Sequence, residues 1–496
     1  MERPETFFES SRRALSNPGL QKALATATGK ALDSRQHAVA DIGEQNWEQL
    51  RTRARAIKEH TIENLDYYLA QLATNVERSG GHVFWAKTAA DARQYITELA
   101  RQKNVDVVVK SKSMMTEEIE LNPALQAAGV EAVETDLGEY IVQLANERPS
   151  HINMPAIHKT RADVADLFSS KLGVERNEDI SEMAGLARRV LRHRFASAQM
   201  GITGVNYAVA ETGTVVLVEN EGNIRLTNSL PRVHVALMGI EKVIPKLADV
   251  DVFMKLLSRS ASGQKICSYV SFLTGAKTSP EDEGPEEFHL VILDNGRIEM
   301  LANPALRESL FCIRCGACLN VCPVYQKIGG HAYGWVYPGP IGAVLTPQMI
   351  GRDRAGHLPF ASTLCGACRD ICPVKINIPQ MLLHLRHEIR EDQPRRTSRT
   401  DFLERAVFRL WASAMKTSLR YRLAARVARG VQKLFGSKNK DGARVLSFSR
   451  WTKTRTAPPL AARSFRERWS ELLIDAEPNA VSEDSRRRPL EHPRHV

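Results

Sequence analysis

The chain has 496 residues, more than a single hydrophobic core normally serves, so we expect two or three domains. Hydrophobic residues make up 43% and charged residues 25%, and no apolar run is long enough to span a bilayer, so the composition is that of a soluble globular protein. The net charge of +11 arises in residues 391–496, which hold 24 Lys/Arg against 12 Asp/Glu. The remaining residues are nearly neutral, which argues against nucleic-acid binding by the main body.

The N-terminal segment, residues 1–65, is polar and helical in character, with mixed charges over residues 48–65 that suit an exposed helix. Its first residues lack the apolar core of a secretory signal. The sequence therefore predicts a cytoplasmic protein that begins with a helical segment.

Residues 66–300 alternate between short apolar runs and helical stretches, which predicts βαβ units and a largely parallel sheet. A helix over residues 160–173 has a start signal in Thr160 and Asp163, three residues apart. The expected early strands and helices alternate along the chain: strands 82–88, 105–110 and 130–136, and helices 91–103, 116–129 and 136–147.

Further along, residues 212–220 and 223–228 flank a turn at Gly222, and residues 232–239 form another buried strand. The sequence Asp294-Asn295-Gly296 is a strong hairpin signal, so we expect strands 288–293 and 297–301 to pair across it. The α/β domain is expected to end near residue 300.

Seven of the eight cysteines lie within residues 301–390, and the first four have the spacing of bacterial ferredoxins, Cys312-x2-Cys315-x2-Cys318-x3-Cys322-Pro323. In that pattern the first three thiolates bind one cluster, and the fourth, turned away before the proline, binds the other. Zinc sites use paired C-x2–4-C units, so this spacing favours an iron–sulfur site over zinc.

The second motif, Cys365-x2-Cys368-x3-Cys372-Pro373, lacks the first cysteine of that pattern, and Ser362 stands in its place. If the two motifs exchange their fourth ligands, the first cluster is bound by Cys312, Cys315, Cys318 and Cys372. The second cluster then has three cysteine ligands, Cys322, Cys365 and Cys368. We therefore expect two [4Fe–4S] clusters in a ferredoxin-like domain.

The fourth ligand of the second cluster is open. Ser362 is one candidate through its oxygen, an external or distant group is another, and a [3Fe–4S] cluster is the third. Cys267 lies outside the motifs, so it is either a buried inert thiol or that distant ligand.

Histidines and aromatic residues accompany the cysteine motifs. His331 and His357 are candidates for iron ligation or proton transfer, against ordinary structural roles. Tyr333, Trp335 and Tyr337 are expected to shield a cluster from water, although core packing explains them almost as well.

Beyond residue 391, apolar residues recur at helical spacing among arginines, which predicts a basic helical region followed from about residue 455 by a poorly ordered tail. Such helices bind a partner protein, lie on an anionic membrane surface or are simply exposed to solvent. We favour a solvated or partner-facing helix pair over peripheral membrane contact.

Several segments together resemble one known family, the iron–sulfur proteins of L-lactate utilization known as the lactate utilization protein B family. The similar segments precede, and in one case separate, the cysteine motifs: residues 110–114, 118–122, 134–144, 149–159, 211–217 and 329–342. The resemblance implies an α/β domain of the isomerase and CoA-transferase type, a helical two-cluster domain and a basic C-terminal domain. It also implies oxidation of L-lactate to pyruvate with two partner subunits, one of them cysteine-rich.

The resemblance makes two loops candidates for binding a small anion. Lys110, Ser111, Lys112 and Ser113 follow a strand, and residues 211–213 (Glu211, Thr212, Gly213) form a second loop, although both loops are also explained as turns. No dinucleotide or phosphate-loop motif is present.

We therefore expect a non-catalytic electron-transfer subunit of an L-lactate oxidoreductase complex. The alternatives are a ligand-binding module that senses redox state, or an electron-transfer subunit for another 2-hydroxy acid or a disulfide.

Overall fold

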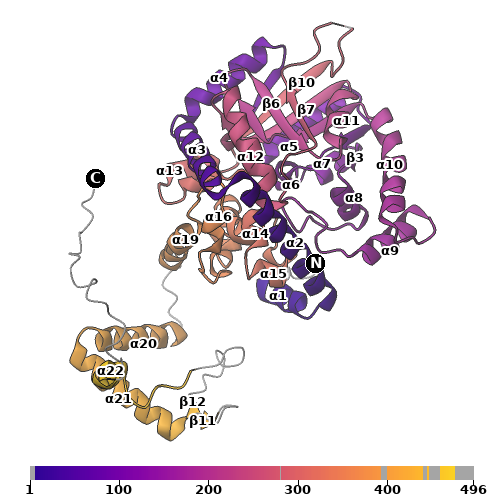
Figure 1. Cartoon of the computed structure of the whole chain (residues 1–496). Coiled ribbons are helices and arrows are strands. Elements are labelled where there is room, and N and C mark those ends of the chain that lie inside the picture. Colours follow the sequence, from indigo (N-terminus) through magenta and orange to yellow (C-terminus); the bar gives the residue numbers. More distant parts are fainter. Residues whose placement is uncertain (1–5, 280, 393–398, 439–443, 446–457, 475–496) are drawn as a thin grey trace. The chain divides into compact units, whose positions relative to one another are not determined.

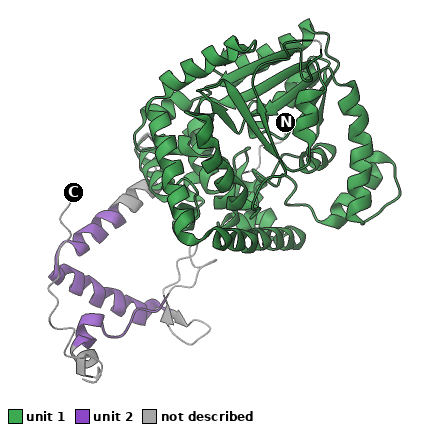
Figure 2. Ribbon diagram, turned by 45° about the horizontal axis from the view of Figure 1, so that its top comes forward, with its two compact units in different colours: residues 1–392 green, residues 393–496 purple. Residues whose placement is uncertain are grey.

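The chain divides into two compact units, residues 1–392 and 393–496 (Figure 2). The computed structural model describes residues 6–279, 281–392, 399–438, 444–445 and 458–474. Within these ranges no helix is both long and apolar enough to cross a membrane.

The first unit begins with helices, as the sequence predicts. They are α1 (Phe7–Leu15), α2 (Pro18–Ile42), α3 (Glu44–Glu63) and α4 (Leu65–Arg78). A capping box between Thr6 and Glu9 starts α1, and Asn17 caps α2. Gly43, with φ of 85°, separates α2 from α3 because its backbone adopts a conformation that side chains disfavour.

Six parallel strands form the main sheet, in the order β1-β10-β7-β4-β2-β3 (Figure 1). The strands are β1 (His82–Ala86), β2 (Val107–Lys110), β3 (Glu131–Glu134), β4 (Met200–Gly204), β7 (Val233–Gly239) and β10 (Glu287–Leu293). This is the parallel α/β sheet that the alternating pattern predicts. The central strands are buried on both faces, which explains their nearly continuous apolar runs.

Helices connect and cover these strands, with α5, α6 and α7 after β1 and β2 and α8, α9 and α10 between β3 and β4. Their bounds are α5 (Ala89–Gln102), α6 (Met114–Glu118), α7 (Leu121–Ala127), α8 (Leu137–Leu144), α9 (Arg161–Leu172) and α10 (Ile180–Ser197). The predicted capping box of Thr160 and Asp163 is present at the start of α9. The predicted helix over residues 116–129 is instead divided between α6 and α7, because Glu120 is left-handed with φ of 50°.

Two predicted strands are helices. Residues 297–301 lie in α13 (Arg297–Ala302), although Asn295 and Gly296 both have the positive φ of a hairpin turn. A hairpin strand has no place there, because β10 already pairs with β1 and β7, and the Arg297 side chain binds buried carboxylates. Residues 223–228 lie in α11 (Asn223–Ser229), whose first N–H groups donate to the Glu219 carboxylate.

A second, four-stranded sheet has the order β8-β5-β6-β9. It comprises β5 (Tyr207–Val209), β6 (Thr214–Glu219), β8 (Val243–Ile244) and β9 (Tyr269–Leu273), joined through η1 (Ile240–Lys242), η2 (Leu247–Asp249) and α12 (Val250–Ala261). One continuous hydrophobic core joins this sheet, the N-terminal helices and the cysteine-containing segment. The α/β and cysteine-containing segments are therefore packed as one body.

Short helices carry the cysteine motifs, and α2 runs between the sheets and this helical region (Figure 1). They are η3 (Arg307–Phe311), α14 (Ala317–Asn320), α15 (Tyr325–Ile328), η4 (His331–Tyr333), α16 (Gly339–Met349), α17 (Arg352–Ala355), η5 (Leu358–Phe360), α18 (Ala367–Asp370) and α19 (Ile378–Asp392).

The described part of the second unit is mainly helical, with α20 (Arg399–Met415), α21 (Ser418–Phe435) and α22 (Phe465–Ile474). Two short strands, β11 (Ser437–Lys438) and β12 (Arg444–Val445), pair in antiparallel fashion. The predicted basic helices are thus present. Within the predicted tail from about residue 455, residues 465–474 form α22, while residues 455–457 and 475–496 lie outside the described residues.

Candidate metal centre

The two cysteine motifs follow the same backbone path. Gly316 and Gly366 are left-handed, with φ of 81° and 88°, and each leads into one short helix, α14 or α18. The residues two positions earlier, Arg314 and Leu364, also have positive φ, of 58° and 56°. Each motif is therefore a tight loop with two left-handed residues, a geometry that is sustained only where surrounding structure holds it.

One set of four thiols surrounds an apolar cavity inside the first unit. The members of this first set are Cys312, Cys315, Cys318 and Cys372. Cys312 is half-buried and the other three are buried, with isoleucine, valine and proline side chains between them. The chain thus brings together the four cysteines that the spacing predicts for the first cluster, although 54 positions separate Cys372 from Cys318.

The other three motif cysteines, Cys322, Cys365 and Cys368, form the second set. Burial and then the neighbouring Cys322 and Cys365 thiolates raise the pKa of Cys368 to about 12. Cys365 is exposed, and the backbone N–H of Ala367 lowers the pKa of its thiol. The second set therefore reaches the surface, whereas the first lies inside.

The two sets adjoin each other. Burial raises the pKa of Cys318, and the thiolates of Cys315, Cys312, Cys372 and then Cys368 raise it further. Cys318 belongs to the first set and Cys368 to the second, so a pair of centres held by these thiols would be neighbours.

Backbone N–H groups already point at three of the sulfurs. Arg314 N donates to Cys312 Sγ at 3.4 Å, Tyr325 N to Cys322 Sγ at 3.5 Å, and Ile376 N to Cys372 Sγ at 3.4 Å. Thiolates that receive such hydrogen bonds in a dry surrounding are the usual ligands of iron–sulfur clusters. The donor set and its surroundings fit that kind of cofactor.

The segment before α9 supports the first motif. Asn153 Nδ2 donates to the backbone oxygen of Cys315, and His151 Nε2 lies 3.1 Å from Asn320 Oδ1. His151 Nδ1 accepts the backbone N–H of Asn153 at 3.0 Å, and burial lowers the pKa of His151 to about 3. His151 is therefore a neutral, fixed support of the loop rather than a proton donor.

Two arginines on α3 hold the second motif. Arg51 Nε donates to the backbone oxygen of Cys372 at 3.0 Å and its Nη2 to that of Asp370 at 2.8 Å. Arg55 Nη1 donates to the backbone oxygen of Lys375 at 2.8 Å. These contacts join positions more than 300 residues apart, and no motif in the sequence signals them.

A buried charge network connects the sheet to the first motif. Arg297 binds both oxygens of Glu118 at 2.8 Å and one oxygen of Glu241 at 2.7 Å, and all three side chains are completely buried. Arg314 Nη2 reaches the other Glu241 oxygen at 3.2 Å. Burial raises the pKa of Glu241, but Arg297 and Arg314 lower it more strongly, to about 2, so Glu241 stays ionised.

A cleft of about 370 Å³ adjoins this network at the carboxyl ends of β2 and β4. The two strands are neighbours in the sheet, and the chain leaves β2 toward β3 on one side but β4 toward β7 on the other. Ligands of α/β sheets usually bind at such a point, where the strand order reverses. Lys112, Ser113, Lys242 and Arg314 all line the cleft. Its size is that of a small-molecule site.

Of the two loops predicted to bind an anion, one lies partly at the cleft and the other does not. Lys112 and Ser113 line the cleft, but Lys110 is buried and paired with Glu134 at 2.7 Å and Glu117 at 3.1 Å. Ser111 is buried as well. Residues 211–213 form the turn between β5 and β6 away from the cleft, where Gly213 packs against α4. No sequence motif signals Lys242 or Arg314 as cleft residues.

The remaining candidates for iron ligation have other contacts. Cys267 lines the cleft beside Ser258. Ser362 Oγ accepts the backbone N–H of Leu364 at 3.1 Å. His331 Nε2 lies 2.6 Å from the backbone oxygen of Arg148.

The aromatic residues near the motifs are packed in the interior. Tyr333 and Tyr337 are buried and Trp335 is half-buried against Tyr337. His357 packs beside Phe7 of α1, with ring centroids 5.5 Å apart. Tyr337 does more than fill space, since its hydroxyl donates to Glu118 at 2.7 Å and its ring lies 4.8 Å from the Arg314 guanidinium.

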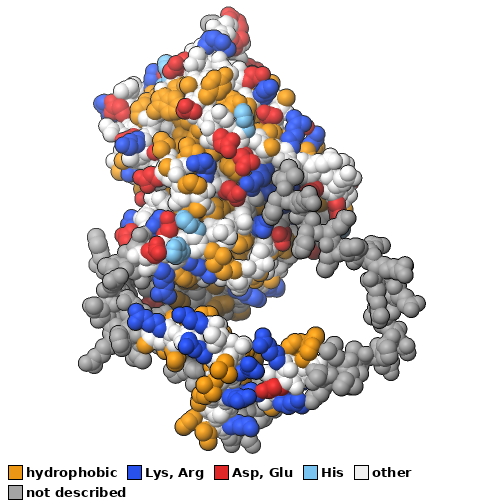
Figure 3. Space-filling model, turned by 90° about the vertical axis from the view of Figure 1, so that its left-hand side faces the viewer, with side chains coloured by type: hydrophobic (Ala, Val, Ile, Leu, Met, Phe, Trp, Pro, Cys, Tyr) orange, Lys and Arg blue, Asp and Glu red, His pale blue; other side chains and the backbone are white. Residues whose placement is uncertain are grey.

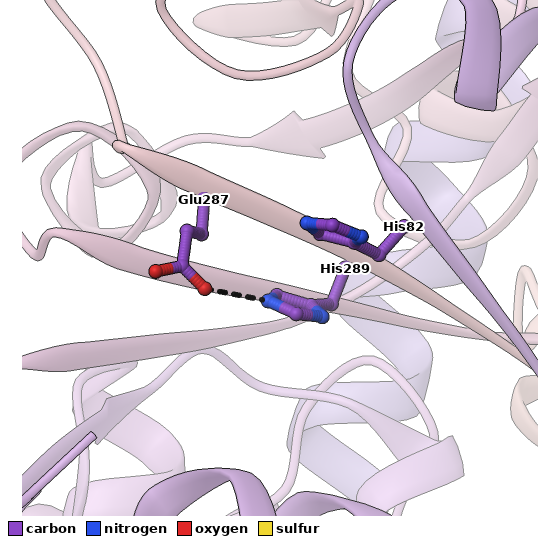
Figure 4. Close-up of side chains that lie close together, drawn as sticks. All are labelled: His82, Glu287 and His289. Carbon is purple, nitrogen blue, oxygen red and sulfur yellow. Dashed lines mark hydrogen bonds and ion pairs between the residues drawn. The ribbon is translucent and has the colours of Figure 1, made fainter. Parts of the chain in front are cut away.

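One further group of metal-ligating residue types lies on β1 and β10, where His82, Glu287 and His289 approach one another (Figure 4). The two imidazoles are stacked with centroids 4.7 Å apart. His289 contacts the Tyr95 hydroxyl at 2.8 Å and Glu287 at 3.3 Å through its two nitrogens. Both ring nitrogens thus have partners, and we interpret the group as a hydrogen-bonded network.

Comparison with known families divides the chain into three matched regions. The LUD domain matches residues 69–293, the 4Fe-4S dicluster domain matches residues 308–376, and the family described as lactate utilisation protein B, C-terminal, matches residues 384–472. The dicluster match covers all seven cysteines of the two sets.

Relatives match over most of the chain. Lactate utilization protein B of Bacillus cytotoxicus is 45% identical over 452 residues, covering 91% of this chain and 94% of that protein. Lactate utilization protein B 2 of Bacillus mycoides is 44% identical over 448 residues, covering 90% and 93%. A crystal structure of a DUF162 family protein from Deinococcus radiodurans matches 46% of this chain and 98% of that one, with 10% identity and a TM-score of 0.26, too low to support an argument. The chain belongs to the lactate utilization protein B family and contains a 4Fe-4S dicluster domain.

Proposed function

We propose that this protein is the electron-transfer subunit of a system that oxidises L-lactate to pyruvate. The observation that carries the proposal is the pair of adjoining thiol sets, one beside a cleft and the other reaching the surface at Cys365. Iron–sulfur clusters, when bound by such thiolates, accept and release single electrons. The family name supplies the substrate of the system.

In this proposal Cys312, Cys315, Cys318 and Cys372 hold one [4Fe–4S] cluster. The second set supplies three ligands to another cluster, whose fourth position is taken by Ser362 or an external group, or which is a [3Fe–4S] cluster. The apolar side chains around the first set exclude water, and the backbone N–H groups stabilise thiolate charge. The exposure of Cys365 gives a redox partner access to the second set.

The helices of the second unit are suited to bind such a partner. Large apolar side chains of α20 and α21 are exposed, with Leu410 at 74%, Trp411 at 56% and Leu423 at 61%. Residues 405–440 contain ten Lys/Arg and no Asp/Glu, and Figure 3 shows basic and hydrophobic side chains intermingled on this unit. We infer that these helices contact an acidic surface of a partner subunit in the cytoplasm.

That inference can be tested by co-purification with the other two lactate utilization subunits. Leu423→Glu should abolish co-purification, because it places a charge on the exposed apolar face. Flotation of the intact chain with anionic vesicles, without co-purification, would instead favour a peripheral membrane role.

The central experiment is iron and acid-labile sulfide analysis with low-temperature EPR on anaerobically purified protein. About eight irons per chain and signals of reduced cubanes are expected for two four-iron clusters. About seven irons with an oxidised three-iron signal would place a vacancy in the second cluster. Zinc without iron would refute the electron-transfer proposal.

Single cysteine variants test the ligand sets. Cys372→Ala should lower iron content and alter the EPR signal of one cluster, and Cys368→Ala should alter that of the other. Cys267→Ala, the matched control outside both sets, should leave iron content unchanged. Full iron in Cys372→Ala would contradict the predicted exchange of ligands between the motifs.

A further inference from the structure

Two basic side chains of the cleft, Lys242 and Arg314, are buried and incompletely partnered. Lys242 and Arg314 are only 7% and 8% exposed. Arg314 Nε and Nη1 have no hydrogen-bond partner, and within the described part of the chain no carboxylate lies within ion-pair distance of Lys242. A buried donor without a partner is costly, so these groups are poised for an acceptor.

The acidic groups of the cleft are in the opposite situation. Glu219 accepts the N–H groups of Ile224 and Arg225 at 2.6 and 3.0 Å, and Asp136 accepts that of Gly138 at 2.9 Å. Glu221 accepts the N–H of Leu137 at 3.1 Å. These carboxylates are engaged as caps of nearby helices and turns. Among the described side chains that line the cleft, the buried polar atoms without a partner are the Arg314 donors Nε and Nη1. The cleft is therefore built for an anion.

We propose that this cleft binds the carboxylate of a small 2-hydroxy or 2-oxo acid, with Lys242 and Arg314 as its donors. The assignment of the acid rests on the proposed function, whereas the negative charge follows from the side chains themselves. Guanidinium and ammonium groups form strong charge-assisted hydrogen bonds with carboxylates. Lys112, whose Nζ donates to the backbone oxygen of Asn153 at 2.5 Å, adds a third positive charge to the cleft.

Arg314 connects this anion site to the first set of thiols. Its side chain lines the cleft, while its backbone N–H donates to Cys312 Sγ at 3.4 Å. The left-handed conformation of Arg314 makes this double role possible, since the loop turns at that residue. A bound acid would lie next to the cysteine loop rather than at a remote regulatory position.

Isothermal titration calorimetry of the full chain, purified anaerobically with its iron, tests the proposal with pyruvate, L-lactate and inorganic phosphate as probes. Pyruvate or L-lactate should bind the wild-type protein. Lys242→Gln should weaken that binding roughly tenfold to a hundredfold, as expected for the loss of one charge-assisted hydrogen bond. Lys246→Gln, an exposed lysine outside the cleft, is the matched control and should bind like the wild type.

Lys242→Arg should restore binding to within a few-fold, which separates loss of the charge from damage to the fold. Binding that is equally tight in Lys242→Gln, or absent from the wild type, would overturn the proposal. Binding of phosphate alone, with the same dependence on Lys242, would overturn the assignment to a carboxylate.

Failure of this inference is distinguishable from failure of the proposed function. A protein with full iron and reducible EPR signals that binds neither acid would refute the anion site alone. A protein without iron would refute the electron-transfer role, whatever the calorimetry shows.

Discussion

Replacing Arg297 by Met should strongly destabilise the first unit. Arg297 makes three hydrogen bonds of 2.7–2.8 Å to Glu118 and Glu241, and none of the three side chains is exposed. The substitution leaves Glu118 with only the neutral donors Asn295 and Tyr337, and Glu241 with Arg314. Removing one partner of a buried ion pair typically costs about 3–5 kcal/mol, because the remaining charge stays desolvated.

The free energy of unfolding should be measured by urea denaturation of the anaerobic protein, followed by circular dichroism. Arg101→Met is the matched control, because Arg101 also pairs with a glutamate, Glu98, at 2.6 Å, but is 75% exposed. Exposed pairs contribute little, so this variant should unfold close to the wild type. The reasoning would be refuted if Arg297→Met were no less stable than Arg101→Met.

Two further predictions concern packing and pH. Gly330→Ala should lower the free energy of unfolding by about 1–3 kcal/mol in the same assay, since the added Cβ would lie 1.8 Å from the backbone oxygen of Ser150. The control is Gly430→Ala on α21, whose Cβ would meet nothing within 4 Å, so this variant should be neutral or slightly stabilising. Burial, and then the neighbouring His289, lower the pKa of His234 to about 3. The contribution of neutral His234 to stability is therefore complete above pH 6.5 and is lost as the pH falls from 6.5 toward 3. At pH 5 the free energy of unfolding should be lower by about 2 kcal/mol. His234→Gln keeps a side chain able to reach Thr203 and should remove that part of the pH dependence. An unchanged pH profile in this variant would show that His234 does not titrate on unfolding.

The cysteine spacing predicted the grouping of four thiols that line one cavity, while iron ligation by either set stays a prediction. The two thiol sets follow from spacing, because the short spacers and the prolines after Cys322 and Cys372 constrain the chain locally. The parallel sheet was predictable for a similar reason, since its strands are apolar and alternate with helices. The capping box at Thr160 was also correct.

What the sequence could not predict depends on tertiary contacts. Arg314 occupies a spacer position to which the motif assigns no residue type, yet it lines the cleft and binds Glu241 from a distant part of the chain. The Asp294-Asn295-Gly296 turn signal failed because it describes backbone conformation alone. The direction taken after Gly296 was set by the ion pairs of Arg297, which local pattern does not encode.

The contacts of Arg51 and Arg55 with the second motif have a consequence for synthesis. During translation α3 emerges early, but its partners at Cys372 and Lys375 follow only after more than 300 further residues. The N-terminal helices therefore complete their packing late, and we expect the cysteines of the growing chain to stay accessible to iron delivery until the second motif is made. Protease sensitivity of α3 in chains truncated before residue 365, and its protection in chains that extend beyond residue 378, would reveal this order of assembly.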